Sequence, residues 1–297
     1  MTTISWPEAA AFTLASAVKD AVAQLTAVGI DSARLDAEML MAETLRIERS
    51  RLFLNRDGML DDAALARFSE LVARRANGEP VSYITGRREF WSLDLVVTPA
   101  VLTPRPETEL LVETSLKLIA AKSSPHILDL GTGSGAIAVA LAKEIPGAEI
   151  VATDIFREAL EIARANARRH GVANRISFFA GDVFTPVAAM TGGFDLIVSN
   201  PPYIRRADIA ALPRDVRDYE PRIALDGGAD GLDFYRRIVT EAPDYLLDGG
   251  FVAVEIGAGM GPEVAGLFTN AGFADVRIEK DLAGLERVVS ARRTARG

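Results

Sequence analysis

A glycine loop between an apolar strand and an apolar helix constrains the fold of this chain more than any other feature. Residues 127–139 read Ile-Leu-Asp-Leu-Gly-Thr-Gly-Ser-Gly-Ala-Ile-Ala-Val. Glycines allow a tight turn and a close approach of the backbone to a ligand, and the amides that begin a helix point at that ligand. Gly131, Gly133 and Ala136 also fit the loose dinucleotide-binding fingerprint. The motif predicts a ligand-binding loop, with a glycine-rich turn that binds nothing as the alternative.

Strands and helices alternate from residue 125 onward, which predicts an α/β domain with a doubly wound, mainly parallel sheet. After the strand at 127–130, apolar runs that predict further strands occupy residues 149–154, 175–180, 194–198 and 249–256. Two later runs, 276–280 and 287–291, predict a closing antiparallel pair.

Residues 1–80 show helical spacing of apolar residues and no strand pattern, which predicts a small N-terminal helical bundle. We expect helices at residues 10–28 and from 31 onward, a short one near 48–54, and another from 61 to 78. No catalytic motif lies in this region, so by elimination we expect it to recognise a partner. Residues 81–108 form a connector with a strand pair and a rigid proline loop, and the catalytic domain occupies 109–297.

The tetrapeptide Asn200-Pro201-Pro202-Tyr203 follows the buried strand at 194–198. Open α/β sheets bind ligands at the carboxyl ends of their strands, and two prolines make a stiff loop whose carbonyls stay free to accept hydrogen bonds. The Asn200 carbonyl, these backbone carbonyls and the flat Tyr203 ring can hold a planar –NH2 group by its two hydrogens. The pattern indicates alkylation of an amide or amino nitrogen, and a simple strand-ending turn is the alternative.

Acidic residues follow the two strands next in sequence after the glycine loop. Asp154 ends the strand at 149–154, about twenty residues past the loop, where a carboxylate can accept both ribose hydroxyls; it can equally cap the following helix. Asp182 and Val183 follow the strand at 175–180. There Asp182 can accept from an adenine amino group while Val183 packs on the ring, although a capped loop explains the pair as well.

Composition narrows the class of protein. The chain of 297 residues has a net charge of −8, with 9 Lys and Arg against 12 Asp and Glu in residues 1–80 and 24 against 29 in the rest. Proteins that grip nucleic acid usually show a basic surface, so we expect no direct nucleic-acid binding. The chain has no cysteine and only two scattered histidines, His126 and His170, so we expect no metal site. We see neither a signal peptide nor a membrane span, and expect a cytoplasmic protein.

With these motifs in hand, the catalytic half resembles class I S-adenosylmethionine-dependent methyltransferases, and the whole chain resembles the release factor glutamine methyltransferases. The narrower resemblance rests on the glycine loop, the Asn-Pro-Pro-Tyr motif and four stretches: residues 79–86, 89–92, 104–109 and 219–222. It implies a seven-stranded sheet, S-adenosylmethionine as cofactor, and methylation of the glutamine amide in the Gly-Gly-Gln loop of peptide chain release factors. It also implies that the helical bundle contacts the release factor.

The resemblance and the residue chemistry together give a set of candidate site residues. We expect the catalytic residues to be Asn200, Pro201, Pro202 and Tyr203. We expect the cofactor to be bound by Asp129, Gly131, Thr132, Gly133, Ser134, Gly135, Asp154, Asp182, Val183 and Asn200. We expect the substrate to be bound by the same catalytic tetrapeptide with Phe90, Arg105 and Glu107, although a capped helix start explains Arg105 and Glu107 equally well.

Four other functions fit part of the pattern. A nucleic-acid amino methyltransferase also suits Asn-Pro-Pro-Tyr, but it must flip its base out and usually carries a basic groove. A ribosomal-protein glutamine methyltransferase shares the tetrapeptide but usually varies residues 104–109. A nicotinamide-dependent oxidoreductase fits the glycine loop but leaves the tetrapeptide unused. A non-catalytic module that kept the fold has no need of Asn200 and Asp154.

Overall fold

The structure is a computed structural model that describes residues 12–294. Its chain divides into two compact units. The first contains the described residues up to Gly86 together with the segment Pro213–Tyr219, and the second contains Arg87–Leu212 and the residues from Glu220 onward. The first unit thus takes seven residues from the second half of the chain, which the sequence-based boundaries at residues 80 and 108 do not include.

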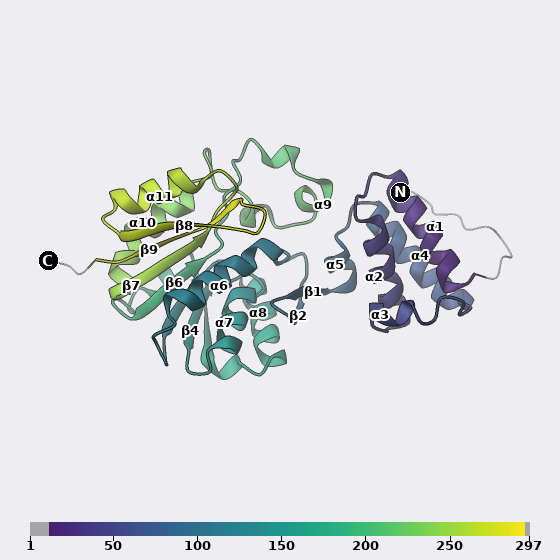
Figure 1. Cartoon of the computed structure of the whole chain (residues 1–297), viewed down its shortest axis with the longest axis horizontal. Coiled ribbons are helices and arrows are strands. Elements are labelled where there is room, and N and C mark those ends of the chain that lie inside the picture. Colours follow the sequence, from purple (N-terminus) through teal and green to yellow (C-terminus); the bar gives the residue numbers. More distant parts are fainter. Residues whose placement is uncertain (1–11, 295–297) are drawn as a thin grey trace. The chain divides into compact units, whose positions relative to one another are not determined.

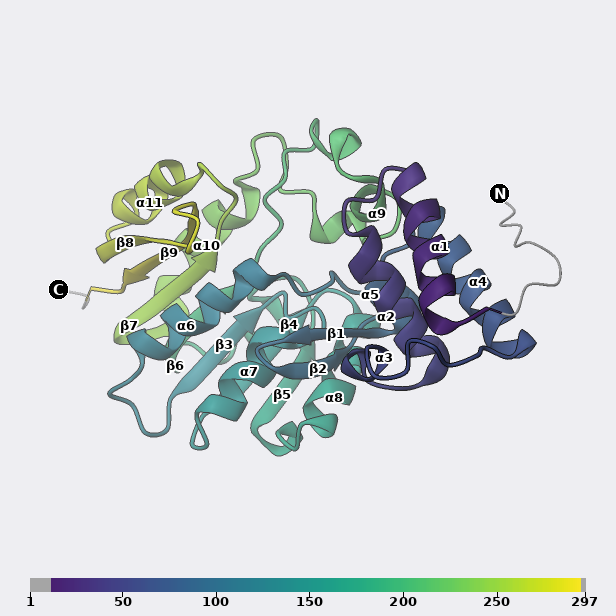
Figure 2. The ribbon, with the colours of Figure 1, turned by 45° about the vertical axis from the view of Figure 1, so that its right-hand side comes forward.

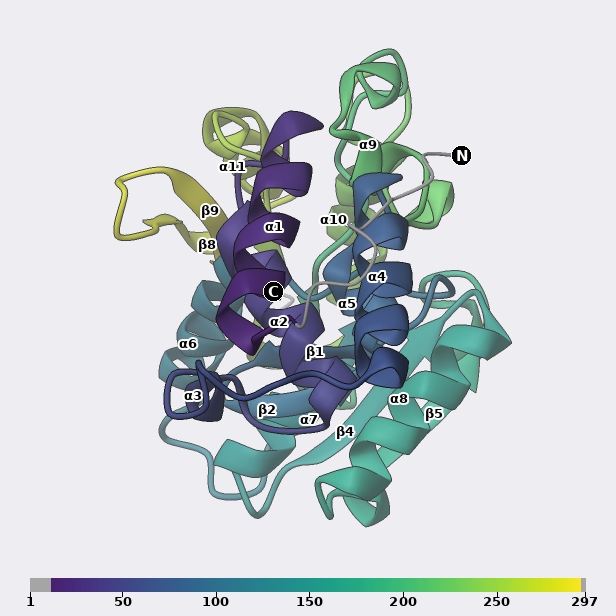
Figure 3. The same cartoon turned by 90° about the vertical axis from the view of Figure 1, so that its right-hand side faces the viewer.

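The first unit is a helical bundle, as predicted. Its helices are α1 (Leu14–Ala27), α2 (Ala33–Leu45), α3 (Arg49–Leu52), α4 (Asp62–Ala76), α5 (Val81–Thr85) and α9 (Arg214–Arg217). The three longest, α1, α2 and α4, pack side by side (Figure 3). The first two residues of the helix predicted at 10–28 lie outside the described residues.

Side-chain caps and apolar stripes explain why these helices form. Thr13 Oγ1 accepts from the Ser16 amide at 3.2 Å, and Asp61 Oδ1 accepts from the Ala64 amide at 2.7 Å, so α1 and α4 both begin at a capping side chain. One face of α1, formed by residues 14, 17, 21 and 25, is buried together with the fully buried Phe68 of α4. Apolar residues three or four positions apart bury one helix face, which is the pattern seen in the sequence.

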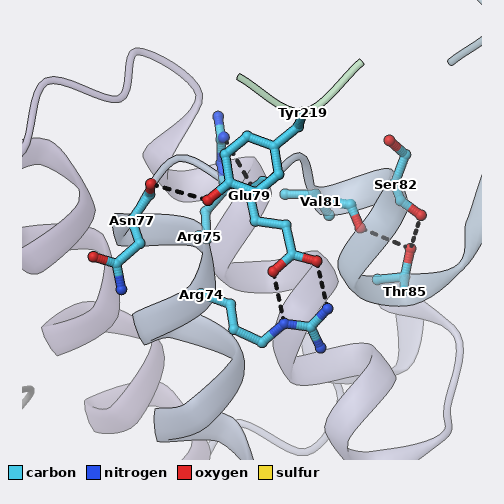
Figure 4. Close-up of polar contacts among 8 residues, drawn as sticks. All are labelled: Arg74, Arg75, Asn77, Glu79, Val81, Ser82, Thr85 and Tyr219. Carbon is cyan, nitrogen blue, oxygen red and sulfur yellow. Dashed lines mark hydrogen bonds and ion pairs between the residues drawn. The ribbon is translucent and has the colours of Figure 1, made fainter. Parts of the chain in front are cut away.

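The segment Pro213–Tyr219 joins the bundle through polar contacts at the C-terminal end of α4 (Figure 4). The Tyr219 hydroxyl donates to the Asn77 carbonyl at 3.2 Å. Arg75, itself buried, lies 2.6 Å from the buried Asp36 carboxylate and 3.5 Å from that of Asp215. The segment therefore adds one hydrogen bond and a second, partly exposed carboxylate to the buried Arg75–Asp36 pair of the bundle.

The second unit contains a seven-stranded, mainly parallel sheet, which confirms the predicted fold class. Its strands are β3 (His126–Leu130), β4 (Glu149–Asp154), β5 (Ile176–Ala180), β6 (Phe194–Ser199), β7 (Leu246–Glu255), β8 (Ala274–Lys280) and β9 (Glu286–Arg292). They lie in the order β5-β4-β3-β6-β7-β9-β8, with only β8 and β9 paired antiparallel to their neighbours. Two shorter strands, β1 (Arg87–Phe90) and β2 (Leu93–Val96), form a separate hairpin.

Helices cover both faces of the sheet. One core lies between the sheet and the face formed by α6 (Glu109–Leu118), α7 (Ala136–Glu144) and α8 (Arg157–Arg169) (Figure 1). A second core joins the opposite face to α10 (Asp233–Tyr245) and α11 (Gly261–Asn270), which lie apart from α6 and α7 in Figure 2. Strands buried on both faces read as continuous apolar runs, which explains the strand prediction.

The strand order places the ligand site. The chain runs from β3 through β4 to β5 at one edge, and then returns to place β6 on the other side of β3. Parallel sheets bind ligands in the crevice at such a reversal, beyond the carboxyl ends of the strands. Leu130 and Ser199, the last residues of β3 and β6, are register partners, and the Ser199 hydroxyl donates to the Leu130 carbonyl at 2.8 Å. The glycine loop and the Asn-Pro-Pro-Tyr loop therefore begin side by side.

Candidate active site

A pocket opens at the carboxyl ends of β3, β4 and β6 within the second unit, with about 1160 Å³ of space that includes open solvent. Eleven predicted site residues line it: Arg105, Gly131, Thr132, Gly133, Ser134, Asp154, Asp182, Val183, Asn200, Pro201 and Pro202. Five others do not: Phe90, Glu107, Asp129, Gly135 and Tyr203. The pocket therefore brings the glycine loop, Asp154 and the first three residues of the Asn-Pro-Pro-Tyr motif together in one lining.

The glycine loop exposes bare backbone to the pocket. Gly131 and Gly133 have φ of 70° and 55°, in the left-handed region that favours glycine, and a Cβ built on either would meet no atom within 4 Å. Open space beside an exposed backbone is what a closely approaching ligand requires. Gly131 and Gly133 therefore have the backbone conformation and the open space that the cofactor implied by the resemblance would need.

Gly135 and Asp129 support the loop from behind. Gly135 precedes α7 with φ of 79°, and a Cβ there would lie 3.0 Å from that of Ala163 on α8. Asp129 is fully buried, and the Thr132 hydroxyl donates to its Oδ2 at 2.6 Å, while its Oδ1 has no hydrogen-bond partner among the described residues. Burial, with the charge of Asp154, raises the pKa of Asp129 to about 7. Both residues shape the loop without lining the pocket.

Asp154 ties the glycine loop to the end of β4. Its Oδ2 accepts from the Gly133 amide at 2.9 Å, and its Oδ1 accepts from the Phe156 amide at 3.0 Å. Burial raises the pKa of Asp154 above its ordinary value. Each carboxylate oxygen keeps a further lone pair for a hydroxyl donor, so the carboxylate can order the loop and bind a ligand at once.

Beyond β5, Asp182 is bound to a neighbouring arginine. Both of its carboxylate oxygens accept from Arg237, at 3.0 and 2.8 Å, and its side chain is about half exposed. Val183 lines the pocket with φ of 46°, an uncommon conformation for a β-branched residue. Such strain is concentrated at ligand sites, and here it directs a short apolar side chain and its backbone to the pocket.

The Asn-Pro-Pro-Tyr loop follows β6 and is backed by glycines that the sequence did not single out. A Cβ at Gly227 would lie 2.7 Å from the Tyr203 Cα, and one at Gly231 would lie 2.5 Å from the Tyr203 carbonyl oxygen. A Cβ at Gly257 would lie 3.1 Å from the Tyr203 ring. The loop is therefore fixed by close backbone packing as well as by its prolines.

Asn200 and Tyr203 have different surroundings. The Asn200 side-chain nitrogen donates to the Thr108 hydroxyl at 3.2 Å, which leaves its carbonyl oxygen for another donor, and Asn200 lines the pocket. Tyr203 packs on the core cluster that contains α10 and α11. Burial and the nearby Glu255 raise the pKa of Tyr203 to about 12, so its phenol stays neutral at neutral pH.

Of the three further substrate-site candidates, one lines the pocket. Arg105 lines it and donates to the buried Glu220 carboxylate at 2.6 Å, which brings two of the resemblance stretches together. Glu107 lies 3.9 Å from Arg287, away from the pocket lining. Phe90 is 2% exposed in the core with Leu95 and Leu111, so the structure does not bring its ring to the pocket.

Two lining residues, Ile155 and Phe156, and one buried acid outside the lining, Glu255, escaped the sequence reasoning. Ile155 and Phe156 keep 49% and 39% of their surface exposed although both are large and apolar, and they line the pocket beside Asp154. Glu255 ends β7 and is 2% exposed. The sequence could have indicated Ile155 and Phe156, since two apolar residues directly after a strand-ending acid lie beyond the sheet core. Glu255 gave no such indication, because it ends an ordinary apolar strand.

Within residues 12–294, His, Asp and Glu side chains do not gather in any group of three or more that could hold a metal ion. In the same part of the chain, each helix is too short or too polar to cross a membrane.

The fold and the site together define a class I methyltransferase. Residues 106–212 match the family described as "Methyltransferase small domain". The fold is shared with the crystal structure of the hMettl16 catalytic domain in complex with MAT2A 3'UTR hairpin 6, with a TM-score of 0.56 over 75% of this chain and 81% of that one. The two sequences are only 16% identical, so this likeness shows the fold alone.

Sequence relatives narrow the class. Residues 16–86 match the family described as "PrmC N-terminal domain". A release factor glutamine methyltransferase of Geobacter sulfurreducens is 48% identical over 267 residues, which cover 89% of this chain and 91% of the relative. One of Cereibacter sphaeroides is 46% identical over 278 residues, covering 94% and 98%. The chain belongs to the release factor glutamine methyltransferase family, which confirms the resemblance found in the motifs.

Proposed function

We propose that this enzyme transfers a methyl group from S-adenosylmethionine to the side-chain amide nitrogen of the glutamine in the Gly-Gly-Gln loop of peptide chain release factors. The observation that carries the proposal is that two loops of different chemistry line one pocket. The glycine loop after β3 offers bare backbone, and Asn200, Pro201 and Pro202 after β6 offer hydrogen-bond acceptors. The name shared by the relatives supports the choice of substrate.

In this proposal the cofactor lies on the first of these loops. Gly131 and Gly133 pass beneath its methionine part, and Asp154 accepts from its ribose hydroxyls. Asp182 and Val183 meet the adenine, and the exposed Phe156 packs against the nucleoside. When bound, S-adenosylmethionine supplies an electrophilic methyl group on a positively charged sulfur.

The second loop holds the substrate amide. Asn200 Oδ1 and the Pro201 carbonyl accept its two N–H groups, which fixes the nitrogen with one face toward the pocket. An amide nitrogen is a weak nucleophile because its lone pair is delocalised, so alignment supplies much of the rate; orientation alone is worth up to about 7–11 kcal/mol. The carbonyls also stabilise positive charge that develops on nitrogen. A neutral Tyr203 beside the loop is no base, and the displaced proton leaves to water.

The helical unit has the task of recognising the protein substrate in this proposal. Residues 1–80 serve recognition, 81–108 connect, and 109–297 carry out methyl transfer. The match of residues 16–86 to a family-specific domain supports a task particular to this family.

The test is methyl transfer from labelled S-adenosylmethionine to a purified release factor, run beside a variant whose loop glutamine is replaced by alanine. We expect label on the first protein and none on the second. Label on both would place the methyl group on another residue. Label on neither, with the cofactor bound, would overturn the substrate assignment and direct the assay to ribosomal proteins and then to nucleic acids.

A further inference from the structure

Glu255 is a buried carboxyl that neither the fold nor the reaction described above explains. It is the last residue of β7, 2% exposed, and its Oε2 has no hydrogen-bond partner among the described residues. Burying an incompletely paired carboxyl is costly, and an apolar residue at a strand end avoids that cost. A buried carboxyl with this free-energy cost indicates that Glu255 has a functional role in the neighbouring pocket.

Three elements bring their side chains together at Glu255. Thr108, 4% exposed, ends the short 3₁₀ turn Pro106–Thr108 before α6, and Asn200 follows β6. Asn200 Nδ2 donates to Thr108 Oγ1 at 3.2 Å. Ser199 of β6 and Val254 of β7 are register partners, so Asn200 and Glu255, the residues that follow them, lie beside each other. Thr108 and Asn200 both lower the pKa of the Glu255 carboxyl, against the larger effect of burial. The three polar groups therefore form one network at the edge of the pocket.

We infer that Glu255 and Thr108 are positioning residues that hold the Asn200 amide by its nitrogen, so that its carbonyl oxygen faces the amide to be methylated. The inference rests on the proposed function and adds two residues to it.

The physical basis is that an ionised carboxylate can only accept hydrogen bonds. The two ends of an asparagine amide have nearly the same shape, so hydrogen-bond partners decide which end faces the substrate. Beside an acceptor-only carboxylate, Asn200 must present its –NH2 group. Thr108 accepts from Asn200, so its own hydrogen is free to be donated to the Glu255 carboxylate. Hydrogen bonds arranged in this one direction strengthen the Asn200 carbonyl as an acceptor.

Protonation of Glu255 would reverse this arrangement. Burial raises the pKa of Glu255 to about 7; the hydrogen bond from Thr108 opposes the rise, the charge of Glu107 adds to it, and Arg287 and Asn200 oppose it. Tyr203 and Tyr235 also face the carboxyl, and burial keeps both phenols neutral. A protonated carboxyl can donate to the Asn200 oxygen and favour the turned amide, so activity should fall as the pH falls through about 7.

The experiment measures kcat and KM for the release factor, and the cofactor Kd, from about pH 6 to pH 9. The variants are Glu255→Gln, Thr108→Val and Thr108→Ser, with Glu263→Gln, an exposed carboxylate on α11, as the matched control. We expect Glu255→Gln and Thr108→Val each to lower kcat about a hundredfold, the usual cost of a small misplacement, with cofactor Kd unchanged. Thr108→Ser keeps the hydroxyl and should stay close to wild type.

The pH profile separates positioning from mere structural support. We expect the wild-type kcat to show an acid limb near pH 7 that Glu255→Gln removes. A double variant that combines Glu255→Gln with Thr108→Val should have a kcat no lower than that of the more impaired single variant. Asp129 also titrates near 7, but it belongs to the cofactor loop, so a limb caused by Asp129 would survive in Glu255→Gln and appear in the cofactor Kd.

Wild-type kcat in either Glu255→Gln or Thr108→Val, a surviving acid limb, or equal losses of kcat and cofactor affinity would each overturn the inference. If Glu255→Gln does not fold, the comparison of Thr108→Val with Thr108→Ser tests the inference. A kcat that depends on the hydroxyl supports the network, and equal kcat values of the two variants contradict it. Failure of the wild-type enzyme to label the release factor would instead overturn the proposed function, and the inference with it.

Discussion

The two loops that line the pocket begin at neighbouring strand ends but are built by opposite means. The loop after β3 uses glycines at positive φ, which leave its backbone bare. The loop after β6 uses consecutive prolines, which fix φ and remove donors. A ligand that fits closely against a backbone needs the first kind of loop, and a substrate held by carbonyl oxygens needs the second.

Each of the two loops is accompanied by a buried acidic residue and a threonine. The Thr132 hydroxyl donates to Asp129, and Thr108 lowers the pKa of Glu255; each acid keeps one oxygen without a hydrogen-bond partner among the described residues. Burial raises the pKa of both acids to about 7. The difference lies in what the threonine holds next: a backbone turn in the first case and the Asn200 side chain in the second. The first pair of residues shapes a loop, and the second pair orients one functional group.

Among the variants that test this difference between the two loops, we expect Asn200→Ala to have the largest effect on kcat. Losing an acceptor aimed at the reacting group should lower kcat about 10²–10³-fold, as removal of one preorganised polar group does in other enzymes. Cofactor affinity should stay unchanged, because it belongs to the other loop. Steady-state kinetics with the release factor and calorimetric titration of the cofactor measure the two quantities.

Asn270→Ala is the matched control, since Asn270 is exposed at the end of α11, outside both loops. Parallel losses of kcat and cofactor affinity in Asn200→Ala would mean that Asn200 mainly builds the cofactor pocket, and the division of labour between the loops would be wrong.

A smaller effect of the opposite kind is expected from Asp154→Ala. A hydrogen bond to a charged group contributes about 1.5–3 kcal/mol, so cofactor Kd should rise roughly 10- to 150-fold. The turnover rate at saturating cofactor should change less. Calorimetric titration measures Kd, with the exposed Asp57→Ala as control. Unchanged binding would refute the assignment of Asp154 to the ribose.

The smallest effects compare two glycines within one loop. Both Gly131→Ala and Gly135→Ala force alanine into left-handed backbone, at about 1–2 kcal/mol of unfolding free energy. Gly135→Ala adds a 3.0 Å approach to Ala163 and should destabilise more, whereas Gly131→Ala points into open space and should weaken the cofactor more. Chemical denaturation and cofactor titration measure the two effects. Equal behaviour of both variants would show that the open side of Gly131 does not face the ligand.

Local patterns predicted the sheet and the two loops because each is encoded by neighbouring residues. The strand–glycine–helix motif fixed one side of the pocket, and the strand-ending Asn-Pro-Pro fixed the other. Glu255 belongs to no motif, and Thr108 lies in the stretch 104–109 without a task that the sequence reveals, because their meeting with Asn200 depends on the order of strands in the sheet. The same limit explains Phe90: an aromatic residue in a motif can face the core as readily as the site, and only the fold decides.

The seven residues Pro213–Tyr219 affect how the helical unit can be exchanged between genes. Because the bundle is built from two separate pieces of the chain, a single genetic crossover near Gly86 would transfer the helices but leave Asp215 and Tyr219 behind. A bundle exchanged in this way would meet a foreign segment opposite Arg75. We therefore expect the two parts of the unit to change together in evolution, so that the helical unit is inherited with the methyltransferase domain rather than acquired as an interchangeable module.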